Sequence, residues 1–349
     1  MSLLIRSRGP LRLGFAGGGT DVSPYSDLYG GYVLNATVDM YAYCTIEPSK
    51  EKKITLFAAD LDERFECPLT AQIPIDGTLT LHKGVYNHIV KNYNNGNPLS
   101  LKMTTYADSP IGSGLGTSST MVVTMLKAFQ EWLKLSFGEY DLAHIAFEIE
   151  RVELGLAGGK QDQYCAAFGG VNFMEFFKDN VLINPLNVKH WIMSELESSI
   201  LLYYMGTSRQ SSVIIEEQIR SARDNKVGYI EAMHEVKAST LKMKEAILKG
   251  DFALFSQCLR DGWESKKKMA STITNPDIDE VYNCVMNNGA KAAKVTGAGG
   301  GGFMMIYCDP VARPFIAKSL NAKEGTIMKV KFSQEGAQSW TINNNKYRR

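Results

Sequence analysis

The chain has 349 residues, of which 44% are hydrophobic and 21% charged, with a formal net charge of +1. This length and composition predict a substantial core divided between two domains. The near-zero charge, without a basic run interleaved with aromatic residues, argues against a nucleic-acid partner. No apolar stretch approaches the roughly 20 residues of a membrane-spanning helix, so a small molecule is the expected partner and no membrane contact is predicted.

The cysteine and histidine patterns argue against a metal or disulfide framework. The six cysteines are scattered without a CxxC pair, and the five histidines lack metal-ligand spacing. The first residues, MSLLIRSRG, lack the apolar region of a signal peptide. We therefore expect reduced thiols and a cytoplasmic location.

The first predicted strand, 11–16, runs into three glycines that are followed by Thr20 and Asp21. Asp21 has two interpretations that the residues themselves do not separate. It is a turn residue that bonds its own backbone, as aspartate after glycine commonly does. Alternatively, it is a carboxylate displayed at a strand end, which suits recognition of sugar hydroxyls.

The rest of the first half alternates strands and helices. Strands are predicted over 31–48, 52–59 and 99–107, and helices near 82–93, 117–135 and 140–155.

A glycine-rich turn at 109–119 precedes the helix that starts at Thr117. Gly112, Gly114 and Gly116 allow positive φ and bring backbone N–H groups close to an anion. The helix N-terminus that follows also favours negative charge, so this turn predicts a phosphate site. No lysine follows the glycines, which excludes a Walker A loop, and a turn that merely caps the helix is the alternative.

The second half begins with a predicted strand at 196–206, continues through helices around 209–248, 251–260 and 276–288, and ends in strands at 292–297, 302–308 and 326–332. We place the boundary around 183–191, giving domains 1–186 and 187–349. Gly206 to Arg209, between a strand and a helix, suggests a second anion site in which Arg209 or, alternatively, Lys160 supplies charge. Five glycines between 297 and 302 lie between two strands and predict a functional loop rather than a linker.

Three motifs in this order, LRLGFAGGGTD, PIGSGLGTSS and TGAGGGG, resemble the GHMP kinases over nearly the whole chain. The resemblance implies an α+β fold of two domains, the first like domain 2 of ribosomal protein S5 and the second ferredoxin-like, with the active site between them. It implies ATP and Mg²⁺ as cofactors. The ATP phosphates are assigned to eight consecutive residues: Gly112, Ser113, Gly114, Leu115, Gly116, Thr117, Ser118 and Ser119.

The same resemblance assigns the chemical roles. Asp162, in the segment GGKQDQY, matches the catalytic aspartate, and Arg12 matches the basic residue that pairs with it, with Arg8 a weaker candidate of the same type. Ser118 and Glu150 match the Mg²⁺ ligands, with Glu148 and Glu153 as neighbouring alternatives to Glu150. Oxygen donors such as these suit Mg²⁺. Substrate contacts are assigned to seven residues: Gly18, Gly19, Thr20, Asp21, Arg209, Gly299 and Gly300.

The segments LRLGFAGGGTD and GGKQDQYCAAFGG are most similar to the anomeric sugar kinases of the family that act on a heptose 7-phosphate. This implies transfer of phosphate from ATP to the C1 hydroxyl of a sugar phosphate, with Asp162 acting as a base or electrostatically. Fucose or a related unphosphorylated sugar is the alternative acceptor, and a non-catalytic sugar sensor is the alternative class. The resemblance is compatible with a homodimer.

Overall fold

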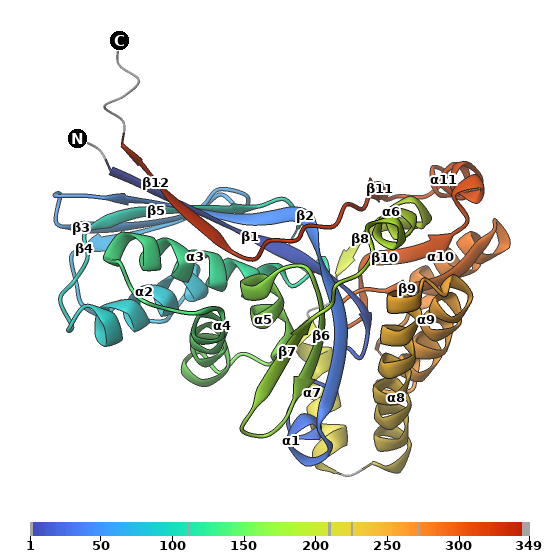
Figure 1. Cartoon of the computed structure of the whole chain (residues 1–349). Helices are drawn as coiled ribbons and strands as arrows, with labels where there is room; N and C mark the ends of the chain where they lie inside the picture. The colour runs from blue at the N-terminus through green and yellow to red at the C-terminus, as the bar shows by residue number, and fades with distance from the viewer. Residues whose placement is uncertain (1–2, 111, 209–210, 225, 271, 344–349) are drawn as a thin grey trace.

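The computed structural model describes residues 3–110, 112–208, 211–224, 226–270 and 272–343. Two β-sheets organise the described chain, one of eight strands and one of four, and each is covered by helices (Figure 1). The long strands β1 and β2 reach from the large sheet toward the second half of the molecule (Figure 1).

The large sheet has the order β12-β1-β2-β5-β3-β4, and β6 and β7 extend it from the first half of β2. All pairings are antiparallel except that of β3 with β5. The strands are β1 (Leu3–Ala16), β2 (Gly31–Pro48), β3 (Lys53–Ala58), β4 (Glu63–Pro68), β5 (Leu101–Ala107), β6 (Val171–Phe176), β7 (Val181–Pro185) and β12 (Gln338–Asn343).

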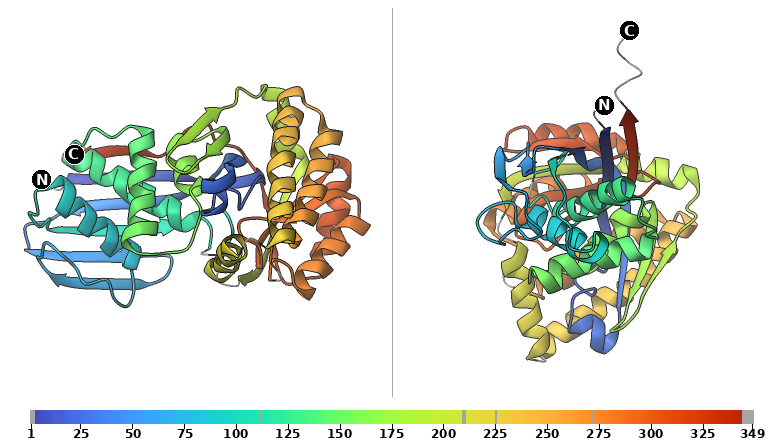
Figure 2. Two further views of the ribbon diagram at one scale, coloured as in Figure 1. Left: turned by 90° about the horizontal axis from the view of Figure 1, so that it is seen from below. Right: turned by 90° about the vertical axis from the view of Figure 1, so that its left-hand side faces the viewer.

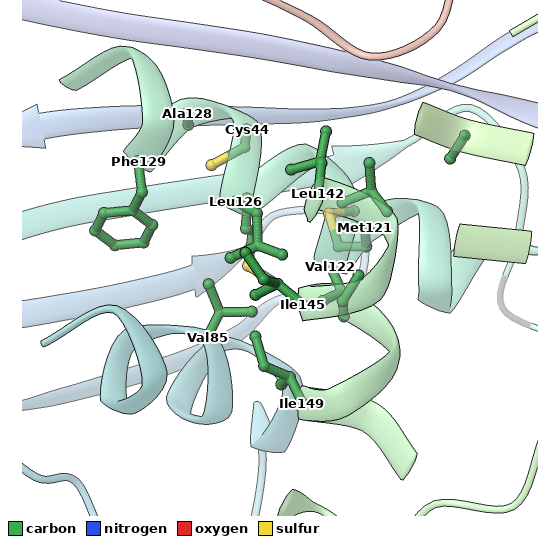
Figure 3. Close-up of a cluster of buried hydrophobic side chains, with 14 of the residues drawn as sticks. Cys44, Val85, Met121, Val122, Leu126, Ala128, Phe129, Leu142, Ile145 and Ile149 are labelled. Carbon is green, nitrogen blue, oxygen red and sulfur yellow. The ribbon is translucent and has the colours of Figure 1, made fainter. Parts of the chain in front are cut away.

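Helices pack against the large sheet and enclose the first core. Buried side chains such as Leu126 and Phe129 of the central helix α3 meet Val85 and Ile145 of neighbouring helices (Figure 3). The apolar residues of α3 recur at helical spacing, which explains why one face of it is buried. The elements here are α1 (Tyr25–Tyr29), α2 (Thr80–Tyr93), α3 (Thr117–Leu133), α4 (Glu139–Phe147), the π-helical η1 (Glu148–Glu153) and α5 (Gln161–Phe168).

The small sheet has the order β11-β8-β10-β9, all antiparallel. In chain order this is the 4-1-3-2 arrangement of a ferredoxin-like sheet, with helices in both crossovers. Every residue of the central strand β10 is buried, as expected for a strand covered on both faces. The strands are β8 (Ile200–Ser208), β9 (Ala290–Val295), β10 (Gly301–Cys308) and β11 (Thr326–Lys329).

The helices of the second half stand beside the large sheet in Figure 2, and α8 and α9 pack together as a long pair. The single helix expected over 209–248 is two helices in the structure, α7 and α8. The elements are α6 (His190–Ser199), α7 (Ser211–Arg223), α8 (Val227–Lys249), α9 (Phe252–Lys267), α10 (Pro276–Asn287), the 3₁₀ turn η2 (Pro310–Ala312) and α11 (Arg313–Leu320).

The last strand crosses back to the first half. Residues Leu3–Arg8 of β1 pair antiparallel with β12, so both ends of the described chain lie together at one edge of the large sheet (Figure 2). The stretch 187–349 therefore contributes a strand to the sheet of 1–186. Residues around 330–337 make the crossing, with Phe332 packed against Phe15 and its backbone N–H bonded to Glu197.

Candidate active site

A cleft of about 310 Å³ lies where the two halves of the molecule meet. From the first half it is lined by the end of β1, the glycine loop before α3, and the starts of η1 and α5. From the second half it is lined by one face of α7, the C-terminal part of α9 and the loop after β9. Most of the residues predicted to carry the chemistry lie here: Arg12, Gly18, Gly19, Asp21, Gly112, Ser113, Gly114, Gly116, Thr117, Ser118, Ser119, Glu150 and Asp162.

The glycine loop has the backbone geometry expected from its sequence. Gly112, Gly114 and Gly116 have φ values of +77°, +79° and +79°, a region that favours glycine. Helix α3 begins directly afterwards at Thr117, so its free N–H groups are available at the cleft. Leu115, one of the eight predicted phosphate contacts, is fully buried in the second hydrophobic cluster and does not line the cleft.

The glycine-rich loop after β9 packs on this loop. A β carbon on Gly302 would lie 2.6 Å from the Ser113 carbonyl oxygen, and one on Gly297 would lie equally close to the Gly114 α carbon. The Thr296 hydroxyl also donates to the Ser113 carbonyl over 3.1 Å. The glycines therefore allow close backbone contact between the two loops.

Gly299 and Gly300, which were predicted to bind substrate, contact Ile273 and lie outside the cleft lining. The N–H of Gly300 donates to the Ile273 carbonyl over 2.9 Å, and a β carbon on Gly299 would also meet Ile273. In this loop Gly297 and Ala298 line the cleft.

Arg12 and Asp162 form an ion pair that lines the cleft, with the Arg12 side chain 6% and the Asp162 side chain 23% exposed. Arg12 Nε donates to Asp162 Oδ1 over 2.7 Å, and Arg12 Nη1 donates to the Gly114 carbonyl over 2.6 Å. Burial opposes the charge of Arg12, but the Asp162 carboxylate outweighs it and raises the pKa of the guanidinium. Asp162 also packs against Gly116, where a β carbon would lie 3.0 Å from its carboxyl carbon. The pair therefore fixes the aspartate against the glycine loop.

Arg8, the weaker candidate on the same strand, lies outside the cleft lining. Its guanidinium donates to Gln338 Oε1 of β12 and lies over the Tyr41 ring.

Glu150 is almost fully buried on the π-helical segment that continues α4. It accepts from Ser119 Oγ over 3.0 Å and from Gln163 Nε2 over 2.5 Å, and lies 3.7 Å from Arg151. Burial raises the pKa of its carboxyl group, while Arg151 acts in the opposite direction. Ser118 is exposed and lines the cleft, as does Glu150.

Glu148 and Glu153, the alternatives to Glu150, lie outside the cleft lining. Glu148 is paired with His144 and Glu153 with His88. The π-helical turn therefore brings Glu150, rather than its neighbours, to the cleft beside the start of α3, and such turns often occur at functional sites.

Asp21 is buried and receives hydrogen bonds from two directions. Oδ2 accepts from the N–H groups of Lys160 and Gln161, and Oδ1 accepts from Gln161 Nε2 and from the N–H of Gly19. These four donors occupy the usual acceptor capacity of a carboxylate. Asp21 thus ties the 17–21 turn to the start of α5, immediately before Asp162.

Thr20 turns away from the cleft. Its hydroxyl lies 2.8 Å from each of the Gly17 and Tyr32 carbonyl oxygens and accepts from the Tyr32 N–H. The Thr20 side chain therefore connects the 17–21 turn to β2 by hydrogen bonds.

Two cations that the sequence analysis did not identify also line the cleft. Lys266, near the end of α9, is buried and donates to the Gly297 carbonyl. Burial, reinforced by nearby Arg12, lowers the pKa of its ammonium group to about 8. Arg151 follows Glu150 and reaches three backbone carbonyls, those of Leu156, Ala157 and Gly159, over 3.4–3.5 Å. Lys266 sits in the run SKKKM, which is typical of a solvated helix end, so only its burial reveals it.

The structure describes only residues 206–208 of the predicted anion site at 206–209. Arg209 lies outside the described residues. Lys160 is described, and its Nζ lies 3.4 Å from the Phe177 carbonyl and 3.9 Å from Asp27.

The described residues contain no group of three or more His, Cys, Asp or Glu side chains arranged to hold a metal ion. The six cysteines, all within the described residues, are free. Within the described ranges, no helix is both long and apolar enough to cross a membrane.

The glycine loop at a helix N-terminus, the Arg–Asp pair and the ferredoxin-like second half are together typical of a kinase of small molecules. Family models agree: "GHMP kinases N terminal domain" matches residues 80–170, and "GHMP kinases C terminal" matches residues 243–325. The chain belongs to the GHMP kinase family, and the predicted two-domain α+β fold is confirmed. It is a sugar kinase that uses ATP and transfers phosphate to an alcohol group.

Within the family, the chain is similar to individual sugar kinases over nearly its whole length. A D-glycero-alpha-D-manno-heptose 7-phosphate kinase of Campylobacter jejuni is 44% identical over 97% of this chain and 99% of its own length. The crystal structure of a D-glycero-D-manno-heptose 1-phosphate kinase from Bacteroides thetaiotaomicron has a TM-score of 0.83 and 46% identity, covering 97% of this chain and 99% of that one. An L-fucokinase/L-fucose-1-P guanylyltransferase of Bacteroides fragilis is 29% identical over 91% of this chain, which spans 36% of that longer protein.

Proposed function

We propose that this kinase transfers the γ-phosphoryl group of ATP to the anomeric C1 hydroxyl of D-glycero-α-D-manno-heptose 7-phosphate. The product is the 1,7-bisphosphate, an intermediate toward nucleotide-activated heptose. The near-full-length similarity to the Campylobacter jejuni kinase supports the choice of sugar.

The observation that carries the proposal is the position of the Arg12–Asp162 pair against the glycine loop. Asp162 Oδ1 accepts from Arg12, whereas Oδ2 accepts no hydrogen bond from the described residues. That oxygen is therefore available to the acceptor hydroxyl, beside the loop assigned to the phosphates. An anomeric hydroxyl is more acidic than an ordinary alcohol, which makes a carboxylate a more effective proton acceptor for it.

Arg12 has two tasks in this proposal. Its Nε donates to the Asp162 carboxylate, and its Nη1 donates to the backbone carbonyl of the glycine loop at Gly114. A guanidinium in this position also stabilises the charge that spreads over the transferred phosphoryl oxygens. Lys266 lies close enough to influence the same region electrostatically, since the positive charge of Arg12 contributes to the lowered pKa of the Lys266 ammonium group.

The donor set of the cleft fits Mg²⁺. Glu150 supplies a carboxylate and Ser118 a hydroxyl, and Mg²⁺ bound with a nucleotide needs only one or two protein oxygens because phosphates and waters complete its shell. The side-chain oxygen of Gln163 is buried and has no donor among the described residues, so it suits a metal-bound water. Bound there, Mg²⁺ would neutralise phosphate charge.

A smaller pocket of about 160 Å³ adjoins the cleft through Thr117 and Ser118. Its lining combines apolar side chains, including Leu61, Leu79 and Met121, with polar ones such as Asp60 and His82. We assign it to the adenine ring, because it lies in the 58–105 region and opens onto the start of α3.

The remaining assignments follow from the family. Gly18 and Gly19 line the cleft and would approach the sugar, while Asp21 would orient the segment that carries Asp162. We propose that the chain forms two domains, 1–186 and 187–349, and that strand β12 of the second stretch joins the sheet of the first domain. We also propose that the protein is cytoplasmic and forms a homodimer.

The test is the release of ADP with Mg²⁺ and a panel of acceptors: heptose 7-phosphate, the unphosphorylated heptose, fucose, galactose and mannose. Phosphorus NMR of the product identifies the modified position. Selective formation of a 1,7-bisphosphate, lost in Asp162→Asn, is the expected result. Preference for an unphosphorylated sugar would replace the proposed substrate, and binding of ATP or sugar without turnover would favour a sensor.

A further inference from the structure

A second pocket, of about 580 Å³, adjoins the cleft. The two share a wall that consists of Asp21, Arg151 and the segment 156–158. Its other walls are Lys160, the end of α4 at Phe147, and the face of α7 that carries Arg220 and Arg223.

None of the phosphoryl-transfer machinery lines this second pocket. The glycine loop, Arg12, Glu150 and Asp162 all line the first cleft only. A molecule whose reacting hydroxyl lies at Asp162 therefore enters the second pocket only with its far end.

The second pocket is cationic. Arg151, Lys160, Arg220 and Arg223 line it, against the carboxylates of Asp21 and Glu216. Asp21 is already bonded to four donors of the 19–21 turn and the start of α5. Glu216 is exposed and is the one acidic lining residue without such bonds among the described residues.

Two of these cations have free donors. Arg220 and Arg223 are exposed, three positions apart on one face of α7, and their guanidinium groups have no hydrogen bond or ion pair within the described chain. Arg151 and Lys160 make only long contacts, of 3.4 Å or more. Arginine side chains in this state suit a phosphate monoester, which carries a charge of about −1.5 to −2 at neutral pH and accepts paired N–H donors.

We propose that this pocket binds the 7-phosphate of the acceptor, with Arg220 and Arg223 as its anchors and Lys160 and Arg151 as supporting charges. The inference rests on the proposed function, because it takes the acceptor to be a sugar phosphate whose C1 hydroxyl lies at Asp162. It explains how a sugar kinase selects an acceptor that already carries a phosphate: an unphosphorylated sugar leaves the arginines without a partner.

The test compares steady-state kinetics of the full chain with heptose 7-phosphate and ATP. The double variant Arg220→Gln/Arg223→Gln is expected to raise the KM for heptose 7-phosphate at least tenfold, with the KM for ATP within twofold of wild type. Arg6→Gln is the matched control, because Arg6 is an exposed arginine on β1 outside both pockets. It is expected to change neither constant.

Glu216→Gln provides a test of opposite sign. Removing this carboxylate from the pocket is expected to lower the KM for heptose 7-phosphate two- to fivefold, because it removes repulsion of the phosphate. The wild-type acceptor KM is also expected to rise with ionic strength, and the double arginine variant to lose most of that dependence.

The outcomes separate the two proposals. If the wild-type chain does not phosphorylate heptose 7-phosphate, the proposed function is wrong. If it does, but the double arginine variant keeps its acceptor KM or raises the KM for ATP equally, the assignment of this pocket is wrong.

Discussion

Gly297 and Gly114 contact each other through backbone atoms, with the position of a β carbon on Gly297 only 2.6 Å from the α carbon of Gly114. The first belongs to the loop between β9 and β10, and the second to the loop that begins α3. The contact joins the two halves of the molecule at the cleft, within the predicted phosphate site. Its closeness explains why both loops are rich in glycine.

Gly297→Ala tests this contact. Gly297 has a φ of +65°, so alanine adds backbone strain and also a clash with backbone that cannot move aside as a side chain can. We expect a loss of about 2–4 kcal/mol in the free energy of unfolding, measured in urea, and a raised KM for ATP.

Gly77→Ala is the control for the backbone strain that alanine adds at a positive φ, without a steric clash. Gly77 also has a positive φ, of +56°, but a β carbon there meets nothing within 4 Å. We expect a loss of about 1 kcal/mol and an unchanged KM for ATP. Equal effects of the two substitutions would contradict the role assigned to the loop contact.

Asp162→Asn is expected to lower kcat by about 10²- to 10⁴-fold, because it removes the negative charge that faces Arg12 and the acceptor hydroxyl. ATP binding, measured by calorimetry, should remain. Arg12→Met should lower kcat comparably and also weaken ATP binding, since Arg12 holds Gly114.

Arg8→Met is the matched control on the same strand. Arg8 contacts Gln338 and Tyr41, so its loss should affect the attachment of β12 and leave kcat within about twofold. A kcat loss as large as that of Arg12→Met would show that the activity depends on β1 generally and not on the ion pair.

Lys266→Met is expected to stabilise the protein and impair the enzyme. The pKa of Lys266 is about 8 in the folded chain against 10.5 as its ordinary value. Between pH 8 and pH 10.5 the unfolded chain binds more protons than the folded chain, so the free energy of unfolding rises with pH in this range. Below about pH 8 Lys266 is charged in both states, and burying that charge lowers the free energy of unfolding by its full amount. Replacement by methionine should therefore stabilise by about 2 kcal/mol at pH 7 and by much less near pH 10.5.

The same variant should lose about 10- to 100-fold in kcat/KM for ATP if the buried ammonium stabilises phosphate charge. Thermal unfolding at pH 7 and pH 10 and steady-state kinetics check both parts. Lys267→Met, which removes a partly exposed lysine paired with Glu264, is the control and should change neither property appreciably. If Lys266→Met stabilised the protein equally at pH 7 and pH 10, the burial of the ammonium charge would not be the cause of the stabilisation.

Glu150→Gln should raise the Mg²⁺ concentration needed for half-maximal activity at least tenfold, because an amide is a weaker Mg²⁺ ligand than a carboxylate. A titration of kcat with MgCl₂ at saturating ATP measures this. Glu148→Gln removes a partly exposed carboxylate of the same π-helical segment, paired with His144, and should leave the titration unchanged. If Glu148→Gln raised the Mg²⁺ requirement and Glu150→Gln did not, Glu148 and not Glu150 would be the Mg²⁺ ligand.

Much of the chemistry is visible in the sequence because it depends on local backbone geometry. Glycines at alternate positions before an amphipathic helix predict a phosphate loop wherever that helix packs, and Gly112, Gly114 and Gly116 have the positive φ that this requires. The order of three such motifs was sufficient to identify the family, and with it the two-domain fold. Asp162, Arg12 and Glu150 were found in this way, and all three line one cleft.

Other features depend on contacts between segments far apart in the chain. Nothing local distinguishes Lys266 from the lysines beside it, and only the packing of α9 against the 297–302 loop buries its charge. The two arginines of α7 are likewise ordinary surface residues until the fold places Lys160 and Arg151 around the same pocket. The long-range pairing of β12 with β1 also has no local signal.

The sequence by itself therefore determined the kinase family, the phosphate loop and the principal catalytic candidates, because each is encoded in a short segment. Only the tertiary structure decided that Asp21 holds the start of α5, that Gly299 and Gly300 contact Ile273, and that a second cationic pocket adjoins the cleft. Burial and the meeting of distant side chains arise from packing, and packing is a property of the whole chain.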